Sequence, residues 1–143
     1  MKVLVTFYSR SGNTEKMASE IAKGAREAGA EVDVRRAAET STDDLLAADA
    51  VAVGSPDYFS YVAGQVKTLF DEALSLKGDL SGKPGACFSS HGGGGKVTAP
   101  FEHLMEAVGF QVVAPCALSH NEPAGKTIDE LRELGARLAR AAG

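Results

Sequence analysis

The loop spanning residues 9–14 gathers polar side chains and one glycine between a short apolar segment and a longer amphipathic one. Three hydroxyl groups, an amide and a guanidinium lie within it, and the unpaired N–H groups of a helix that begins there attract anions. The pattern therefore predicts a phosphate site, whose residues are Ser9, Arg10, Ser11, Gly12, Asn13 and Thr14. The alternative is a capped turn with Ser11 or Asn13 as the N-cap, which needs only one such residue.

This loop matches neither of two widespread phosphate-loop motifs, G-x-x-x-x-G-K-[ST] and G-x-G-x-x-G. The later run Gly92–Lys96 superficially resembles the first of them. However, Ser90 stands where its first glycine belongs, and Val97 replaces the Ser or Thr that binds magnesium. Hydrolysis of a nucleoside triphosphate is therefore excluded.

Two later loops have compositions suited to a flat ligand. The first holds two of the three Tyr residues and one of the six Phe residues, and such rings stack on planar groups. Its members are Ser55, Pro56, Asp57, Tyr58, Phe59, Ser60 and Tyr61. The second has glycines that let the backbone approach a ligand, and its members are Ser89, Ser90, His91, Gly92, Gly93 and Gly94. The alternatives are local packing or a subunit contact for the aromatic loop, and a flexible surface loop for the glycines.

The elements that position these loops follow from the alternation of short apolar runs with longer amphipathic segments. Strands are predicted at 2–8, 31–36, 50–54, 85–89 and 110–118, and helices at 13–28, 42–48, 63–76, 98–108 and 127–142. Five β-α repeats indicate an α/β fold, a parallel sheet with helices on both faces. A closed barrel of eight repeats needs about 250 residues, so an open doubly wound sheet is expected. Ligands of such sheets bind beyond the carboxyl ends of the strands, where all three loops fall.

Composition narrows the class of protein further. The 143 residues suit one domain, 1–143, and the formal net charge of −4 argues against nucleic acid as a partner. No apolar run approaches the roughly 18–20 residues that span a bilayer, and no secretory signal is recognisable, so a cytoplasmic protein without membrane contact is expected. Cys87 and Cys116 are too few for a disulfide scaffold and are interpreted as small hydrophobic residues.

The histidines and cysteines suggest no metal or covalent chemistry. His91, His103 and His120 lack metal-ligand spacing, and no metal is predicted. His103 is interpreted as a surface or packing residue, whereas His91 and His120 fall at the ligand-binding end, where either could contact the ligand. A phosphatase loop is excluded because Gly93 stands six residues after Cys87, where Arg is needed, and a phospho-receiver domain is excluded because Ser9-Arg10 replaces its acidic pair.

Residues 3–14 resemble the flavodoxin signature for the phosphate of flavin mononucleotide (FMN), a strand followed by (S/T)-x-(S/T)-G-N-T. The resemblance continues through 54–56 with Phe59, through 63–65 with Lys67, and through 89–94, where it is closest to the branch containing the WrbA-type NAD(P)H:quinone oxidoreductases. It implies a three-layer α/β/α sandwich with a five-stranded sheet of order 2-1-3-4-5. It also implies FMN held non-covalently where the connection order reverses.

The resemblance also implies a role for each loop. Ser9, Arg10, Ser11, Asn13 and Thr14 would hold the phosphate, 56–61 would flank the isoalloxazine ring, and 89–94 would line its pyrimidine edge and the ribityl chain. No catalytic residue is implied, because the flavin carries the electrons and the protein tunes its potential.

Two functions remain open at this stage. The small size and the lack of a substrate-domain insertion favour a flavoprotein of electron transport that serves redox partner proteins or a small-molecule acceptor, as a monomer or homodimer. The alternative is an oxidoreductase, an FMN-dependent NAD(P)H:quinone or other acceptor reductase, favoured by the glycine loop and His91. Neither branch fits completely: the chain has no Trp, a single acid (Asp57) in the three loops, and Tyr58 where the reductases commonly have Arg.

Overall fold

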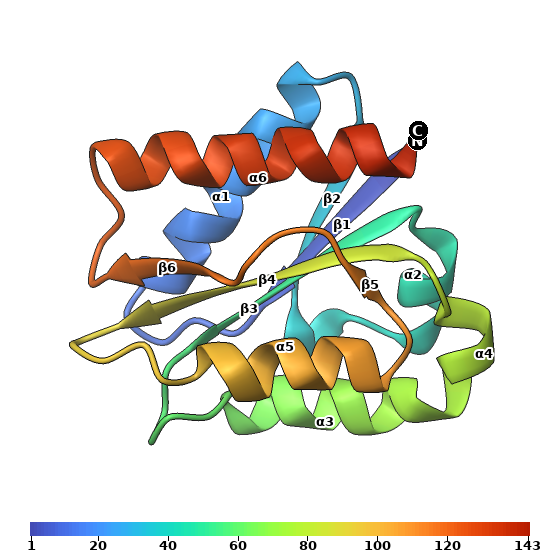
Figure 1. Cartoon of the computed structure of the whole chain (residues 1–143), viewed down its shortest axis with the longest axis horizontal. Coiled ribbons are helices and arrows are strands. Elements are labelled where there is room, and N and C mark those ends of the chain that lie inside the picture. Colours follow the sequence, from blue (N-terminus) through green and yellow to red (C-terminus); the bar gives the residue numbers. More distant parts are fainter.

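Six parallel strands form one sheet in the computed structural model, which describes all of residues 1–143 (Figure 1). The strands are β1 (Lys2–Phe7), β2 (Glu31–Arg36), β3 (Ala50–Pro56), β4 (Pro84–His91), β5 (Gln111–Val112) and β6 (Ala117–His120). Their order is β2-β1-β3-β4-β5, and β6 also pairs with β4. The predicted parallel sheet and its order 2-1-3-4-5 are therefore confirmed.

The fifth position of the sheet is occupied by two short strands, so the prediction of one continuous strand over 110–118 is wrong. β5 pairs with the start of β4 and β6 with its end. Between them, Pro115 has no N–H to give to the ladder. The next amide, of Cys116, donates instead to the Glu102 side chain at 3.1 Å. The chain thus leaves the sheet edge and returns to it within four residues.

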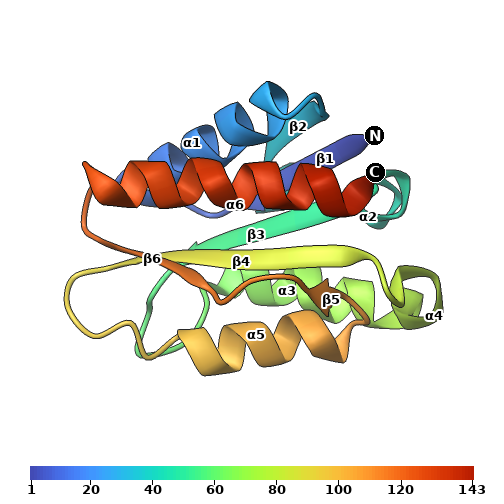
Figure 2. The ribbon, with the colours of Figure 1, turned by 45° about the horizontal axis from the view of Figure 1, so that its top comes forward.

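Helices cover both faces of the sheet (Figure 2). The α-helices are α1 (Asn13–Glu27), α2 (Thr42–Ala47), α3 (Gly64–Ala73), α4 (Lys77–Leu80), α5 (Thr98–Ala107) and α6 (Lys126–Ala142), with 3-10 turns η1 (Ala37–Glu39) and η2 (Leu74–Leu76). One core cluster contains buried residues of α1 and α6, and the other contains those of α2 to α5. No helix is long and apolar enough to cross a membrane.

Helices α1 and α6 touch through glycine, and this contact fixes the position of α1. A Cβ at Gly24 would lie 1.9 Å from the Arg132 carbonyl oxygen, and one at Gly135 would lie 2.0 Å from that of Ile21. Beside this contact, Glu20 is buried and accepts from Arg132 at 2.8 Å and from Lys23 at 3.0 Å. Burial alone would raise the pKa of Glu20, but these two cations hold it below its ordinary value.

Both cysteines belong to the core, as predicted, and both are free thiols. Cys87 is fully buried in β4, and Cys116 precedes β6 with 7% of its surface exposed. The neighbouring Cys116 thiol and burial both raise the pKa of the Cys87 thiol. Because the thiolate is the reactive form, Cys87 is a poor nucleophile.

Candidate functional site

The structure brings the three predicted loops together at the carboxyl ends of β1, β3 and β4. These strands are neighbours, with Phe7 opposite Gly54 and Pro56 opposite Ser90. The hydrogen bonds of the sheet extend past the strand ends, because the Tyr8 amide donates to the Gly54 carbonyl at 3.1 Å and the Asp57 amide to that of Ser90 at 2.8 Å. The loops therefore share one rigid base.

The first turn of α1 has free amides. Gly12 is the N-cap, with a left-handed backbone (φ 98°), and no side chain caps the helix. The amides of Asn13, Thr14 and Glu15 donate no hydrogen bond, and the first amide that does is that of Lys16. The alternative of a turn capped by Ser11 or Asn13 is thus wrong. Free amides at the positive end of a helix dipole are suited to a phosphate.

The side chains of this loop differ in accessibility. Arg10, Ser11 and Gly12 are exposed, and Ser9 and Asn13 are half-buried. The Ser9 hydroxyl accepts from the Gly12 amide at 3.2 Å, which tightens the turn. Thr14 is 1% exposed, and its hydroxyl shares a 2.8 Å hydrogen bond with that of Ser90. Thr14 therefore links the first loop to the third, a role that its spacing did not reveal.

The aromatic loop is a tight hairpin turn whose tip displays the Phe59 ring to solvent. Tyr58 and Tyr61 exchange backbone hydrogen bonds of 2.9 and 3.0 Å, and the Ser60 amide donates to Asp57 Oδ1 at 2.8 Å. Phe59 and Ser60, at the tip, have positive φ values of 55° and 65°, which non-glycine residues rarely adopt. The Phe59 side chain is fully exposed. A strained backbone with an exposed ring indicates a functional surface.

Two tyrosines that follow the carboxyl ends of β1 and β3 pack against each other. Tyr58 packs edge-to-face on Tyr8, with ring centroids 6.3 Å apart. Burial and the neighbouring Tyr8 raise the pKa of Tyr58, and Arg10 opposes this shift. Tyr8, Tyr58 and Arg10 thus join the first loop to the second. Tyr8 was predicted as the last residue of the strand 2–8, and its position at the strand end was a signal for this role.

Ser55 and Ser89 lie beneath the site rather than at its surface. Both are fully buried. The Ser55 hydroxyl donates to the Pro56 carbonyl at 2.7 Å and accepts from the Ala63 amide at 2.8 Å, so it holds the two ends of the aromatic loop together. The Ser89 hydroxyl donates to the Ser90 carbonyl at 3.3 Å. Their hydrogen bonds support the loops, and their surfaces are closed to a ligand.

A polar cavity of about 390 Å³ lies between the second and third loops. It has no hydrophobic lining residue, and it is lined by Asp57, Ser60, His91, Gly92, Gly93, Gly94 and Lys96. The His91 and His120 rings are 5.4 Å apart, and His120 Nε2 is 3.1 Å from the Gly92 carbonyl oxygen. His91 Nδ1 is buried without any hydrogen-bond partner. His103 is exposed on α5, as predicted.

These observations fit FMN. The free amides of α1 match its phosphate, and the polar cavity with the unpartnered His91 nitrogen matches the polar groups of a flavin or its ribityl chain. The rings of the second loop supply the flat surface that an isoalloxazine needs.

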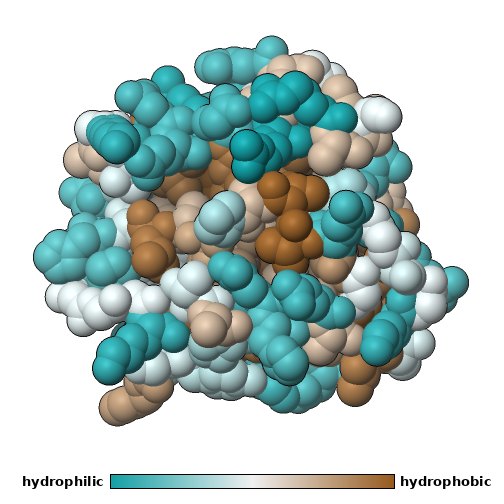
Figure 3. All heavy atoms as spheres, in the orientation of Figure 1, coloured by the Kyte–Doolittle hydropathy of each residue, from teal (hydrophilic) through white to brown (hydrophobic).

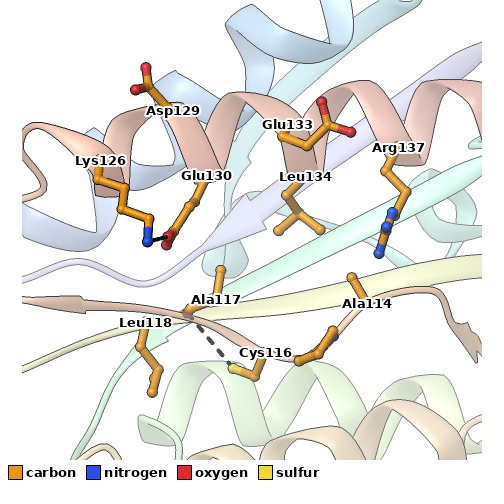
Figure 4. A pocket seen from close by; sticks show the side chains of 11 residues that line it. Ala114, Cys116, Ala117, Leu118, Lys126, Asp129, Glu130, Glu133, Leu134 and Arg137 are labelled. Carbon is orange, nitrogen blue, oxygen red and sulfur yellow. Dashed lines mark hydrogen bonds and ion pairs between the residues drawn. The ribbon is translucent and has the colours of Figure 1, made fainter.

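The largest hollow of the molecule, about 640 Å³, lies elsewhere, along α6 and residues 114–118. Figure 3 shows hydrophobic side chains in the hollow below α6, and Figure 4 shows Leu134, Ala117 and Leu118 beneath a rim that includes the Lys126–Glu130 ion pair. None of the predicted site residues lines it. This hollow is therefore separate from the three predicted loops.

Comparisons with known proteins agree with this geometry. The sequence model described as Flavodoxin matches residues 5–137. The chain belongs to the flavodoxin family. This membership confirms the predicted family and FMN as the cofactor of this flavodoxin-like redox protein.

Similar proteins include flavodoxins and quinone reductases. A flavodoxin of Aquifex aeolicus is 45% identical over 96 residues, which are 66% of this chain and 52% of that protein. An NAD(P)H dehydrogenase (quinone) of Caulobacter vibrioides is 34% identical over 154 residues, covering 91% and 77% of the two chains. The chain therefore spans about half of the first relative and about three quarters of the second.

The fold is confirmed independently by solved structures. The structure of a flavodoxin from the domain Archaea superposes with a TM-score of 0.88 at 30% identity, and each chain covers 99% of the other. The chain thus corresponds along its whole length to a flavodoxin.

Proposed function

We propose that residues 1–143 form one flavodoxin-like domain that binds FMN and carries electrons between redox partners. The observation that carries the proposal is the N-terminus of α1, where three successive amides are free and no side chain competes for them. Bound FMN supplies reversible uptake and release of electrons at its ring. The chain supplies the phosphate site, a surface for the ring and a polar environment for its edge.

Each of the three loops contacts a different part of FMN in this proposal. Residues 9–14 bind the phosphate through the helix amides, and the exposed Ser11 and Arg10 add a hydroxyl and a positive charge. Residues 56–61 of the aromatic loop cover the ring, and its first residue, Ser55, holds them in place. Residues 90–94 present backbone groups and His91 to the remaining edge. Phe59 is fully exposed beside this surface. A redox partner can therefore approach the flavin ring without any rearrangement of the protein core.

Reconstitution tests the FMN site directly. The purified protein is incubated with FMN and desalted, and its visible spectrum and melting temperature are recorded. A yellow protein whose melting temperature rises with FMN concentration is expected, because a ligand that binds only the folded state stabilises it. A colourless protein whose melting temperature ignores FMN would remove the proposal.

The Ser11→Ala variant tests the location of the phosphate. It is expected to weaken FMN binding by about tenfold or more, since a hydrogen bond to a charged group contributes at least about 1.5 kcal/mol. Riboflavin, which lacks the phosphate, serves as the control ligand, and its affinity should not change. Equal weakening of both ligands would place the phosphate elsewhere.

A second candidate function is reduction of a quinone or another acceptor by NAD(P)H. The polar cavity with His91 and Lys96 supports it, as does the similarity to the Caulobacter protein over 91% of the chain. Stopped-flow mixing of the FMN-loaded protein with NADH and with NADPH separates the two candidates. A carrier keeps its flavin oxidised with both nucleotides, although dithionite reduces it. Rapid bleaching followed by turnover on a quinone would establish the reductase instead.

A further inference from the structure

Arg36, the last residue of β2, contacts the phosphate loop in two ways. Its Nη1 donates to the Ser9 carbonyl at 3.3 Å, and its Nη2 donates to Glu15 Oε1 at 3.1 Å. Its guanidinium carbon also lies 5.3 Å from the centroid of the Phe7 ring, over which the group packs. The parallel pairing of Arg36 with Phe7 places it at the end of β1, where the loop begins. One side chain thus reaches the start of the loop and the helix that follows.

The contact with Ser9 constrains the backbone of the loop. Ser9 also accepts the Gly12 amide with its side chain, so its position determines how the turn closes before α1. The Phe7 ring limits the rotamers of Arg36, because a guanidinium over an aromatic face is favoured. Arg36 therefore holds the loop in the conformation that leaves the amides of α1 free.

The contact with Glu15 changes the charge at the phosphate site. Glu15 is an acid in the first turn of α1, and its own amide is one of the three free donors. A carboxylate there stabilises the helix but repels a phosphate dianion. The ion pair with Arg36 offsets this charge. Lys16, the cation next to Glu15 in the sequence, pairs with Glu122 instead, at 2.7 Å from its Nζ.

We propose that Arg36 is a positioning residue for the FMN phosphate, which holds the Ser9 backbone and neutralises Glu15. This inference rests on the proposed FMN site. Its consequence is specific: Arg36 raises the affinity for FMN relative to riboflavin, since only FMN carries the phosphate. A residue that merely stabilised the fold would affect both ligands alike.

The test compares Arg36→Ala with Arg35→Ala, using the dissociation constants of FMN and riboflavin measured by flavin fluorescence. Arg35 is a matched control, since it is the preceding residue of the same strand but pairs with Asp33 and Asp44, away from the loop. Arg36→Ala is expected to weaken FMN binding by about tenfold and riboflavin binding by less than about twofold. Arg35→Ala should leave the ratio of the two constants unchanged.

Two further variants separate the two contacts of Arg36. Adding Glu15→Gln to Arg36→Ala should restore part of the FMN affinity, because the unpaired carboxylate is then gone. Arg36→Lys should give an intermediate ratio, since lysine keeps the charge but lacks the planar fork. No recovery in the double variant would overturn the neutralisation of Glu15.

The outcomes distinguish this inference from the proposed function. If the unchanged protein binds FMN more tightly than riboflavin and Arg36→Ala keeps that preference, the role of Arg36 is overturned and the phosphate site stands. If the unchanged protein shows no preference for FMN, the phosphate site itself fails, and the inference fails with it.

Discussion

Helices α1 and α2 both begin in hydroxyl-rich segments, but their N-terminal amides differ in hydrogen bonding. At α2, the Ser41 hydroxyl accepts from the Asp44 amide at 3.2 Å, and Asp44 accepts from the Ser41 amide at 2.8 Å, so the polar residues satisfy one another. At α1, Gly12 occupies the N-cap position and the amides that follow it are free. The same types of residue cap one helix and leave the first amides of the other unpaired. The residue at the N-cap makes the difference.

Converting the start of α1 into one like that of α2 should have the largest effect. Gly12→Asp places a carboxylate at the N-cap, where it competes for the free amides and repels the phosphate. We expect FMN affinity to fall by about 100-fold or more, since a hydrogen bond from an amide to a phosphate and the repulsion of a like charge each contribute on the order of 1–3 kcal/mol. Isothermal titration with FMN and riboflavin measures this change.

Gly12→Asn is the matched control for this variant. The φ of 98° strains both residues alike, and a Cβ at position 12 meets no other atom. The difference between the Asp and Asn variants therefore reports the charge alone. Equal FMN affinities for the two variants would contradict a phosphate at the start of α1.

Removal of the hydrogen bond between Thr14 and Ser90 is expected to have the next largest effect, a loss of stability. Thr14→Val keeps the shape of the side chain but leaves the buried Ser90 hydroxyl without its partner. We expect the FMN-free protein to lose about 1–3 kcal/mol of unfolding free energy, measured by urea denaturation. Ser90→Ala completes a double-mutant cycle. If the two losses simply add, the two hydroxyls are not coupled and the link between the loops is absent.

Much of this architecture could be predicted because the elements follow local periodicity. The apolar run of residues 50–54 and the small-residue face of 13–28 each indicate one type of element, and β3 and α1 appear there. The order of the strands needed the resemblance, because β-α repeats alone do not fix which strands are neighbours. The division of the fifth strand was missed, although Pro115 was its signal.

The details of the site were less predictable because they depend on side-chain direction and on contacts distant in sequence. Ser55 and Thr14 were predicted to be cofactor-binding residues, but the fold buries both. Arg36 lies 27 residues beyond Ser9, and only the parallel pairing of β1 and β2 brings them together. The full exposure of Phe59 follows from a turn with two positive φ values, which no composition rule suggests for Phe and Ser.

Substitution of one serine at the start of each helix compares the two N-termini again, with smaller expected changes in stability. Ser41→Ala removes the cap of α2 and should lower the unfolding free energy by about 1 kcal/mol, without changing FMN affinity. Ser11→Ala at α1 removes no cap, so the stability of the FMN-free protein should change by less than about 0.5 kcal/mol, while FMN binding weakens. Thermal and urea unfolding measure the first effect, and FMN titration measures the second. A stability loss of the same size in both variants would mean that Ser11 is a cap after all.

The smallest effect concerns the dependence of stability on pH at α2. The Ser41 amide, together with its hydroxyl and with Arg35, holds the pKa of Asp44 below its ordinary value of 3.8, although burial opposes this shift. A carboxyl whose pKa is lower in the folded state stabilises the protein fully above the ordinary pKa, and this contribution is lost as the pH falls through the folded value. The wild type should therefore be more stable than Asp44→Asn near pH 6, and the gap should narrow towards about pH 3. Urea denaturation across this range measures the gap. A gap that stays constant with pH would show that Asp44 caps the helix without its charge, and the two helix N-termini would then differ in hydrogen bonding alone.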